Sequence, residues 1–202
     1  MKLKLNTKDQ DIWFSSDFHV NHNKDFIYEK RGFKTIQEHN DALIVSINES
    51  VKERDILFHL GDMFLNSTPE SMEEFLSKLK CKRIYALYGN HPGPLKNRYK
   101  FKQIINLTDF MEIYVDGKYV TLCHYPMYAW DKSHRGAYQL CGHNHMSLDY
   151  SHPDKGIDRC MDVGIDYNFK PWKWQDIDAL LSTRLLRENG HHVKDMQEDG
   201  TI

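Results

Sequence analysis

The sequence predicts a layered α/β domain, and three observations support that fold class. Apolar runs of strand length alternate with segments of helical periodicity through the first half of the chain. Each run ends in glycine or in small polar residues, which mark the end of a strand. The chain has 202 residues and 40% hydrophobic content, enough for one domain to bury a core without disulfide bonds. Strand, helix, strand, helix, strand is the order expected of a sheet with right-handed crossovers.

The first half of the chain supplies three predicted strands and two predicted helices. The strands cover residues 11–17, 55–60 and 83–88. Thr35 and Glu38 match a capping box, so a helix of about four turns is expected after them. A second helix is expected from Pro69, a residue favoured at the first helical position. The apolar positions of each helix share one face: Ile36, Leu43, Ile44, Ile47 and Val51, then Met72, Phe75, Leu76 and Leu79.

The second half of the chain is richer in strands. Residues 113–122 predict a β-hairpin, because Asp116-Gly117 between two alternating segments favours a type I′ turn. Further strands are expected over residues 137–140 and 160–166. A final helix over residues 174–187 should pack on a sheet through four apolar side chains, which are Ile177, Leu180, Leu181 and Leu185.

The composition argues against several classes of protein. A formal net charge of -2 argues against broad electrostatic capture of nucleic acid. No run approaches the roughly 18 apolar residues of a membrane span, and residues 1–6 contain no signal-peptide core. The cysteines form no Cys-x-x-Cys pair, so we interpret them as buried thiols of a reducing compartment: Cys81, Cys123, Cys141 and Cys160. We expect a cytoplasmic protein without membrane contacts, with one domain over residues 1–187 and a polar, frayed tail over 188–202.

Eight polar side chains follow the ends of the predicted strands. They are Asp17, His19, Asp62, Asn90, His91, His124, His143 and His145. In an open α/β sheet the ligand crevice lies beyond the C-terminal ends of the strands, so these residues can converge there. Imidazole, carboxylate and amide groups suit zinc, iron or manganese better than calcium or copper(I). The set exceeds the needs of one ion, and two ions about 3.5 to 4 Å apart need a bridging ligand such as a carboxylate.

Five short motifs carry these residues. They are Asp17-x-His19, Gly61-Asp62, Gly89-Asn90-His91, His124 and Gly142-His143-x-His145. In order and spacing they resemble the five motifs of the calcineurin-like metallophosphoesterases, over residues 12–145. The segments flanking Asp17 and His124 resemble the small stand-alone bacterial and phage members of that family.

The resemblance implies a fold, a cofactor and a mechanism. The fold is a four-layer sandwich of two mixed β-sheets flanked by helices, and the cofactor is two divalent metal ions, Mn²⁺, Fe²⁺/Fe³⁺ or Zn²⁺, at the strand ends. The implied ligands are Asp17, His19 and His145 for the first ion, Asn90, His124 and His143 for the second, and Asp62 as the bridge. A hydroxide held between the ions would attack phosphorus in line. His91 would donate a proton to the leaving oxygen or stabilise its charge.

Two residues near the implied site depart from the family pattern or allow two interpretations. The family usually places Asp or Glu after Gly-Asn-His, where this chain has Pro92, so the orientation of His91 must come from elsewhere. His22 is either a contact of the substrate phosphate, together with Asn90 and His91, or an exposed loop histidine.

Other residues carry weaker signals. Asp162 and Asp166 either support the site or lie outside it, and His59 is expected to be packed or hydrogen-bonded inside a strand. A basic run either attracts an anionic substrate or forms a solvated face: Lys96, Arg98, Lys100 and Lys102. The aromatic residues of the second half are expected to pack in the core and at its rim, with base stacking as the alternative: Tyr125, Tyr128, Trp130, Tyr167, Trp172 and Trp174.

The chain has no room for a large cap domain between His91 and His124, so the site should be open. We therefore predict a phosphodiesterase that acts on small phosphodiesters, nucleotides or nucleic-acid ends. The alternatives are a phosphomonoesterase or protein phosphatase, a nuclease with a basic groove, and a non-catalytic binding module on the same fold. The presence of all eight positions favours a catalyst.

Overall fold

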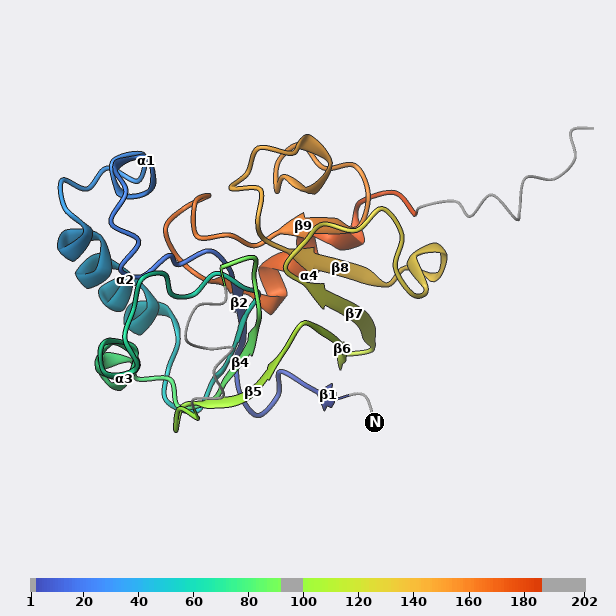
Figure 1. The fold of residues 1–202 in the computed structure, drawn as a ribbon. Coiled ribbons are helices and arrows are strands. Elements are labelled where there is room, and N and C mark those ends of the chain that lie inside the picture. Colours follow the sequence, from blue (N-terminus) through green and yellow to red (C-terminus); the bar gives the residue numbers. More distant parts are fainter. Residues whose placement is uncertain (1–2, 92–99, 187–202) are drawn as a thin grey trace, which may run out of the picture.

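The protein is built around two β-sheets that face each other (Figure 1). The computed structural model describes residues 3–91 and 100–186. In these residues each sheet has five strands and combines parallel with antiparallel pairs. Helices flank the sheets, so the predicted α/β class with two mixed sheets is confirmed.

The first sheet contains the three strands predicted in the first half of the chain. Its order is β10 (Trp172–Lys173), β2 (Ile12–Ser15), β3 (Ile56–His59), β4 (Ile84–Leu87) and β5 (Ile104–Thr108). Strands β2 to β5 are parallel, so their C-terminal ends lie along one edge. The sequence did not predict β5 or β10. Strand β5 has no fully buried residue and β10 has only two residues, so neither forms a long apolar run.

The second sheet comes mainly from the second half of the chain. Its order is β1 (Leu3–Leu5), β6 (Phe110–Val115), β7 (Lys118–Cys123), β8 (Tyr138–Cys141) and β9 (Cys160–Asp162). The β6–β7 turn has positive φ at Asp116 (46°) and Gly117 (90°), as a type I′ turn requires, so the predicted hairpin is confirmed. The prediction of a strand over 160–166 is wrong beyond Asp162. There the chain leaves the sheet, and the Ile165 N–H donates to the Ser16 carbonyl at 3.0 Å.

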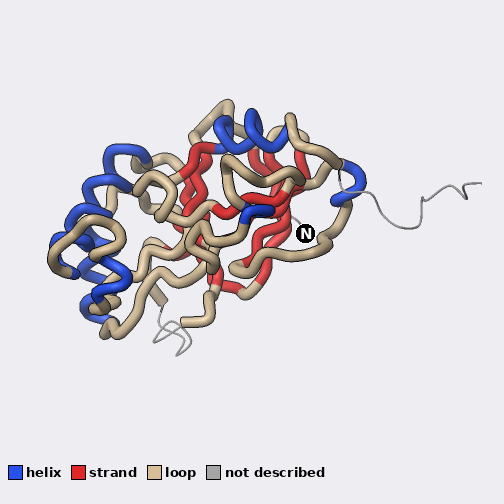
Figure 2. The backbone as a smooth tube through the Cα atoms, turned by 90° about the horizontal axis from the view of Figure 1, so that it is seen from above, coloured by secondary structure: helices blue, strands red, loops and turns tan. Residues whose placement is uncertain are grey.

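Helices α2 (Ile36–Ser50) and α3 (Pro69–Lys78) cover the outer face of the first sheet (Figures 1 and 2). Both helices begin as predicted, because the side chains of Thr35 and Thr68 accept the N–H groups of Glu38 and Ser71. In the part of the chain that the structure describes, the other helices are α1 (Asp25–Tyr28), α4 (Trp174–Ser182) and two short 3₁₀ helices, η2 (Ser133–Arg135) and η3 (Asp149–Ser151).

Helix α4 is shorter than predicted. It ends at Ser182, and Leu185 is 70% exposed instead of packing on the sheet. The chain turns away from the helix because the Leu185 N–H donates to the Ile157 carbonyl at 3.0 Å. The expected end at Arg187 and the tail over 188–202 lie outside the described residues.

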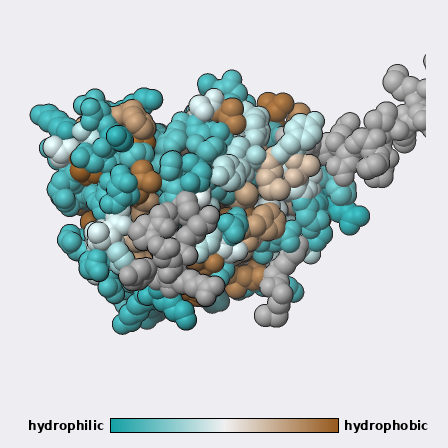
Figure 3. All heavy atoms as spheres, viewed as in Figure 1, coloured by the Kyte–Doolittle hydropathy of each residue, from teal (hydrophilic) through white to brown (hydrophobic). Residues whose placement is uncertain are grey.

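Two apolar clusters hold the strands in place, and through them the loops at the strand ends. One fills the space between the sheets and includes Phe14, Phe58, Leu122, Leu140 and Trp174. The other lies under α2 and α3 and includes Leu43, Ile47, Leu57, Phe75 and Ile84. Burying each such side chain contributes roughly 1.5–3 kcal/mol. The face seen in Figure 3 is largely hydrophilic, and none of the helices in the described residues has the length and apolarity to cross a membrane.

Candidate metal centre

The loops after five strands bring the predicted polar residues to one edge of the two sheets. Strand β2 leads to Asp17 and His19, β3 to Asp62, and β4 to Asn90 and His91, while β7 and β8 lead to His124, His143 and His145. Ring centroids of His19 and His145 lie 5.1 Å apart, and those of His124 and His143 lie 5.1 Å apart. All eight residues predicted from the sequence therefore lie at one site.

The backbone of this site is unusual. Positive φ angles occur at five of the residues, namely Asp17 (59°), His19 (51°), Asp62 (54°), His143 (73°) and His145 (48°). A residue other than glycine rarely adopts this conformation, and each instance costs of the order of 1–3 kcal/mol unless the surroundings hold it. Such strained backbone is found preferentially at functional sites.

The glycines within the motifs let the loops approach closely. A Cβ atom at Gly142 would collide with the side chains of Ser16 and Asp17, and one at Gly61 would collide with the His124 ring. Gly61 also has a φ of 105°, which favours glycine. The glycines of the motifs are therefore required by the packing of one loop on another.

Asp17, His19 and His145 form the first half-site. His19 Nε2 lies 3.8 Å from Asp17 Oδ1, and His145 Nε2 lies 4.0 Å from the same oxygen. Asp17 Oδ1 and His19 Nε2 are buried, and neither has a hydrogen-bond partner among the described residues. Burial, with a contribution from the nearby His145 imidazole, lowers the pKa of His19 to about 2, so this ring is neutral and keeps a lone pair. The half-site presents unpaired acceptors that a cation would satisfy.

Asn90, His124 and His143 form the second half-site. Asn90 Oδ1 lies 2.9 Å from His124 Nε2 and 2.9 Å from His143 Nδ1. His124 Nδ1 lies 2.8 Å from the Leu60 carbonyl, to which it must donate, so in the neutral ring Nε2 carries a lone pair. Burial acts to lower the pKa of His124, but its hydrogen bond to Asp62 and the nearby Asp17 carboxylate outweigh burial and raise it, so a cation bound at Nε2 would take the place of a proton there.

Asp62 lies between the two half-sites. Its Oδ2 atom is 3.9 Å from His19 Nε2 and 3.6 Å from His124 Nε2. Burial acts to raise the pKa of Asp62, but the His124 ring and the His91 N–H, which donates to Oδ1 at 2.9 Å, outweigh burial and lower the pKa to about 2. Asp62 is thus ionised and placed as a bridging carboxylate would be.

These residues meet the chemical requirements of a metal centre. Ligand atoms of Asp17, His19 and His145 lie within 4.8 Å of one another, as do those of Asp17, Asp62 and His124. Neutral imidazoles, buried carboxylates and unpaired acceptors are the groups that divalent transition metals bind. The donor set therefore fits the two divalent ions that the sequence led us to expect.

Support for the first half-site comes from Asp166 and Arg31. Asp166 Oδ2 accepts from His145 Nδ1 at 2.8 Å, which leaves His145 Nε2 directed toward Asp17. The Arg31 guanidinium pairs with both oxygens of Asp166. The supporting position considered for Asp166 is therefore observed. Sequence analysis missed Arg31, since it lies in a loop 14 residues after Asp17 and belongs to no motif.

Asp162 also borders the first half-site. It is fully buried, and its Oδ1 accepts from the Gly164 N–H at 2.8 Å. Burial, with the nearby carboxylate of Asp17, raises the pKa of Asp162 to about 7. The two supporting positions considered for Asp162 and Asp166 thus both lie next to the ligands.

His22 is buried, with 7% exposure, so of the two interpretations stated the exposed loop histidine is wrong. Its Nδ1 lies 3.1 Å from His19 Nδ1, and its ring centroid lies 6.1 Å from that of His91. Burial and the neighbouring His91 ring lower the pKa of His22. His91 itself is exposed, and Pro92 lies outside the described residues.

The remaining predicted residues take simpler roles. His59 is fully buried against the ring of Phe18, with centroids 4.2 Å apart, and neither of its nitrogens has a hydrogen-bond partner among the described residues. Of the two alternatives expected for His59, packing or hydrogen bonding inside a strand, the structure shows packing. Tyr125 is 46% exposed beside the second half-site, with its ring centroid 4.8 Å from that of His143. Lys96 and Arg98 of the basic run lie outside the described residues.

Three comparisons relate this chain to known proteins. A family model described as calcineurin-like phosphoesterase matches residues 11–193. The uncharacterised protein MJ1445 of Methanocaldococcus jannaschii is 34% identical over 80 residues, which cover 40% of this chain and 46% of that protein. The chain thus matches just under half the length of that relative. A crystal structure of AQ665, a protein of unknown function from Aquifex aeolicus, has a TM-score of 0.66 at 20% identity and covers 85% of this chain and 100% of that chain.

Proposed function

We propose that this chain, which belongs to the calcineurin-like phosphoesterase family, is a metal-dependent phosphodiesterase. Members of this family act on phosphate esters with the help of divalent metals, and the chain has the Asp and His groups to hold them. The observation that carries the proposal is the convergence of buried, unpaired acceptors: Asp17 Oδ1 and His19 Nε2 lie together without partners among the described residues. Such groups are costly to bury unless a ligand satisfies them.

The proposed ligands divide between two ions. The first half-site would hold one ion, the second half-site would hold the other, and Asp62 would bridge them. Two divalent cations would supply a water nucleophile of lowered pKa and neutralise charge on the phosphoryl oxygens. Manganese, iron and zinc all suit this donor set.

His91 acts on the leaving group in this proposal. Its backbone N–H is fixed by Asp62 at 2.9 Å, while its side chain is exposed at the edge of the site. An exposed imidazole beside the bridging carboxylate can reach a bound phosphate ester and protonate the leaving oxygen. In this proposal His22, Asn90 and His91 also contact the substrate phosphate, and the ring centroids of His22 and His91 lie 6.1 Å apart.

The exposure of the second half-site supports a diester substrate. Asn90 and His91 are exposed and His143 is half-buried, so a phosphate bearing two substituents can enter. The half-exposed ring of Tyr125 borders this entrance and offers an aromatic contact for one substituent, as in a nucleotide or an aryl ester.

The cysteines bear on the compartment in which the protein acts. All four are free thiols, which fits the reducing compartment that we expect, the cytoplasm.

A comparison of two chromogenic esters tests this function. The manganese-loaded protein should hydrolyse bis(p-nitrophenyl) phosphate faster than p-nitrophenyl phosphate. Faster turnover of the monoester would reverse the substrate preference and favour a phosphomonoesterase or protein phosphatase. Absence of turnover with manganese, iron and zinc alike would favour a binding module on the same fold.

A further inference from the structure

We infer that Arg31 is a positioning residue that holds the first half-site in its metal-binding geometry. The inference rests on the proposed metal centre and concerns a residue that touches no substrate. Arg31 lies between α1 and α2, outside the five motifs, and its side chain is only 3% exposed. A charged group so deeply buried is stable only when every hydrogen bond is satisfied.

All five guanidinium N–H groups of Arg31 have acceptors. Nε donates to Asp166 Oδ1 at 2.9 Å, and Nη2 donates to Asp166 Oδ2 at 2.9 Å. The second Nη2 proton goes to the Asp17 carbonyl at 2.8 Å, and Nη1 donates to the Phe18 carbonyl at 3.1 Å. His39 Nε2, 2.9 Å from Nη1, completes the set. One side chain thus contacts the backbone of a proposed ligand and the carboxylate that orients another.

The two contacts act on different ligands. Asp17 and His19 both have positive φ, and the carbonyls bound by Arg31 are those of Asp17 and of Phe18 between them. Donors on consecutive carbonyls fix the orientation of the peptide planes, so Arg31 stabilises the strained loop. Through Asp166, the same guanidinium sets the orientation of the His145 ring.

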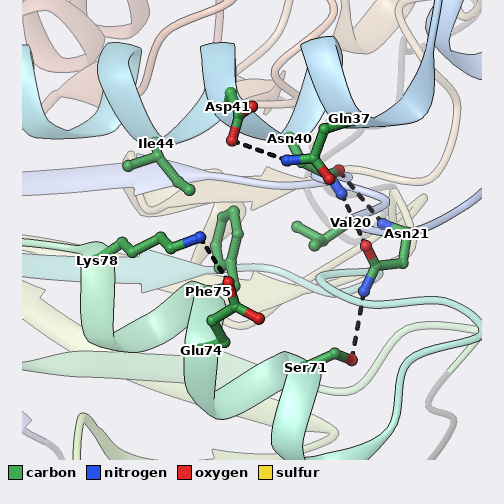
Figure 4. Close-up of a pocket in the computed structure, with 10 residues that line it drawn as sticks. All are labelled: Val20, Asn21, Gln37, Asn40, Asp41, Ile44, Ser71, Glu74, Phe75 and Lys78. Carbon is green, nitrogen blue, oxygen red and sulfur yellow. Dashed lines mark hydrogen bonds and ion pairs between the residues drawn. The ribbon is translucent and has the colours of Figure 1, made fainter.

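A second set of contacts ties Arg31 to the helical layer. His39 of α2 accepts from Arg31, so its Nδ1 carries the proton and faces Asn40 Oδ1 at 3.3 Å. Asn40 in turn donates to Asn21 Oδ1 at 2.7 Å and accepts from the Asn21 N–H at 3.3 Å. Figure 4 shows Asn21 and Asn40 meeting in a polar pocket between α2 and α3, where Asn21 also contacts Ser71.

These contacts place the loop over residues 17–22 between two supports. Arg31 binds it near Asp17, and Asn40 binds it at Asn21. A lysine at position 31 would keep the charge but would have three protons on one atom, which cannot span Asp166 and two carbonyls. The planar fork of arginine is therefore the feature that the site requires.

Metal binding by the full-length protein tests this role without reference to activity. We compare wild type, Arg31→Lys, Arg31→Ala and Asp166→Asn, with Arg54→Lys as the control at an exposed arginine. Manganese affinity and stoichiometry are measured by calorimetry, and electron paramagnetic resonance distinguishes an isolated ion from a coupled pair. We expect the Arg31 and Asp166 variants to bind manganese at the first half-site about 10–100-fold more weakly. The Arg54 variant should match wild type.

The outcomes separate this inference from the proposed function. Failure of the wild type to bind two ions would contradict the proposed metal centre itself. Wild-type affinity in folded Arg31→Lys, with a lower melting temperature of the metal-free protein as the only change, would assign Arg31 a purely structural role and overturn the inference. Should Arg31→Ala fail to fold, Arg31→Lys and Asp166→Asn still decide, because both keep a polar side chain of similar size.

Discussion

All three proposed ligands of the first half-site have left-handed backbone, and Asp17 and His19 are buried, whereas in the second half-site only His143 has left-handed backbone and only His124 is buried. Asp17 and His19 are 0% and 3% exposed, and Arg31 and Asp166 fix the surrounding backbone and the His145 ring. Asn90, in contrast, is exposed, and the His124 ring donates to the Leu60 carbonyl. From this difference we propose that the first half-site is a preformed site for one ion and that the second is an open site, where the other ion would meet the substrate.

Substitution of Asp62, the proposed bridging carboxylate, should have the largest effect on metal binding and turnover, because both half-sites share this residue. Asp62→Asn removes the charge and one of the two equivalent oxygens, so we expect loss of the coupled pair of ions and a drop in turnover of more than about 100-fold. Metal analysis beside the rate of diester hydrolysis checks this. Asp109→Asn at an exposed position is the control. Two fully bound ions in Asp62→Asn would show that the half-sites need no bridge.

His91, at the exposed side of the centre, should transfer a proton to the leaving group but should not bind metal. His91→Ala is therefore expected to keep both ions and to lower turnover by roughly 10²–10⁴-fold, the range of general acid catalysis. Metal content and rate are measured on the same sample. Loss of an ion from His91→Ala would make this residue a ligand and would enlarge the second half-site.

The second half-site can be weakened alone. Asn90→Ala removes the oxygen that faces both His124 and His143, so we expect one ion per chain with the affinity of the first half-site unchanged. Binding of the second ion should weaken about 10–100-fold or more. Asn106→Ala, an exposed asparagine on β5, should bind as wild type does. Equal weakening of both ions would remove the distinction between a preformed and an open site.

His39, which contacts Arg31 behind the first half-site, should make the stability of the protein depend on pH. Burial and the adjacent Arg31 lower the pKa of His39 to about 4, against 6.5 for the unperturbed group, although Asn40 and Asp166 act in the opposite direction. The unfolded chain therefore binds the proton first as the pH falls. The stability that neutral His39 contributes is present above about pH 6.5 and is lost progressively down to about pH 4, by up to about 3 kcal/mol.

Urea unfolding of the metal-free protein at pH 7.5 and pH 5 measures this loss. His39→Gln cannot titrate, so the loss of stability between these two pH values should be smaller in the variant than in wild type. An equal loss in both proteins would show that other groups account for the acid sensitivity and that His39 is not held neutral by Arg31.

The smallest effect on catalysis is expected from substitution of Tyr125, the aromatic residue beside the second half-site. Tyr125→Ala should raise the KM for an aryl phosphodiester by about 2–10-fold, corresponding to roughly 0.5–1.5 kcal/mol for an aromatic contact. The KM for a dialkyl phosphodiester should not change. Tyr119→Ala, at a similarly exposed tyrosine that packs on Tyr114, is the matched control. Equal changes for both esters would exclude a specific aromatic contact.

The sequence predicted the parts of the site that depend on residue type and order. The proposed ligands follow apolar strands, and parallel strands bring their C-terminal ends together, so the convergence of Asp17, Asp62 and Asn90 after β2, β3 and β4 could be predicted from the chain alone. The β6–β7 hairpin could also be predicted, because Asp116-Gly117 determines its turn locally.

Contacts between distant segments were not accessible. Arg31 reaches Asp166 across 135 positions of sequence, and no periodicity or motif marks either residue as a partner of the other. The left-handed backbone at Asp17 and His19 is equally hidden, because neither residue type demands it. The end of α4 was missed because Leu185 continues the apolar pattern while its N–H pairs with a separate loop.

A manganese titration of the full-length wild-type protein, followed by electron paramagnetic resonance, tests most directly whether a preformed site and an open site make one dinuclear centre. We expect two ions per chain in two steps. The first, tighter step should give the signal of an isolated ion, and the second should convert it to that of a coupled pair. One ion at saturation, or two ions whose signals never couple, would contradict the account.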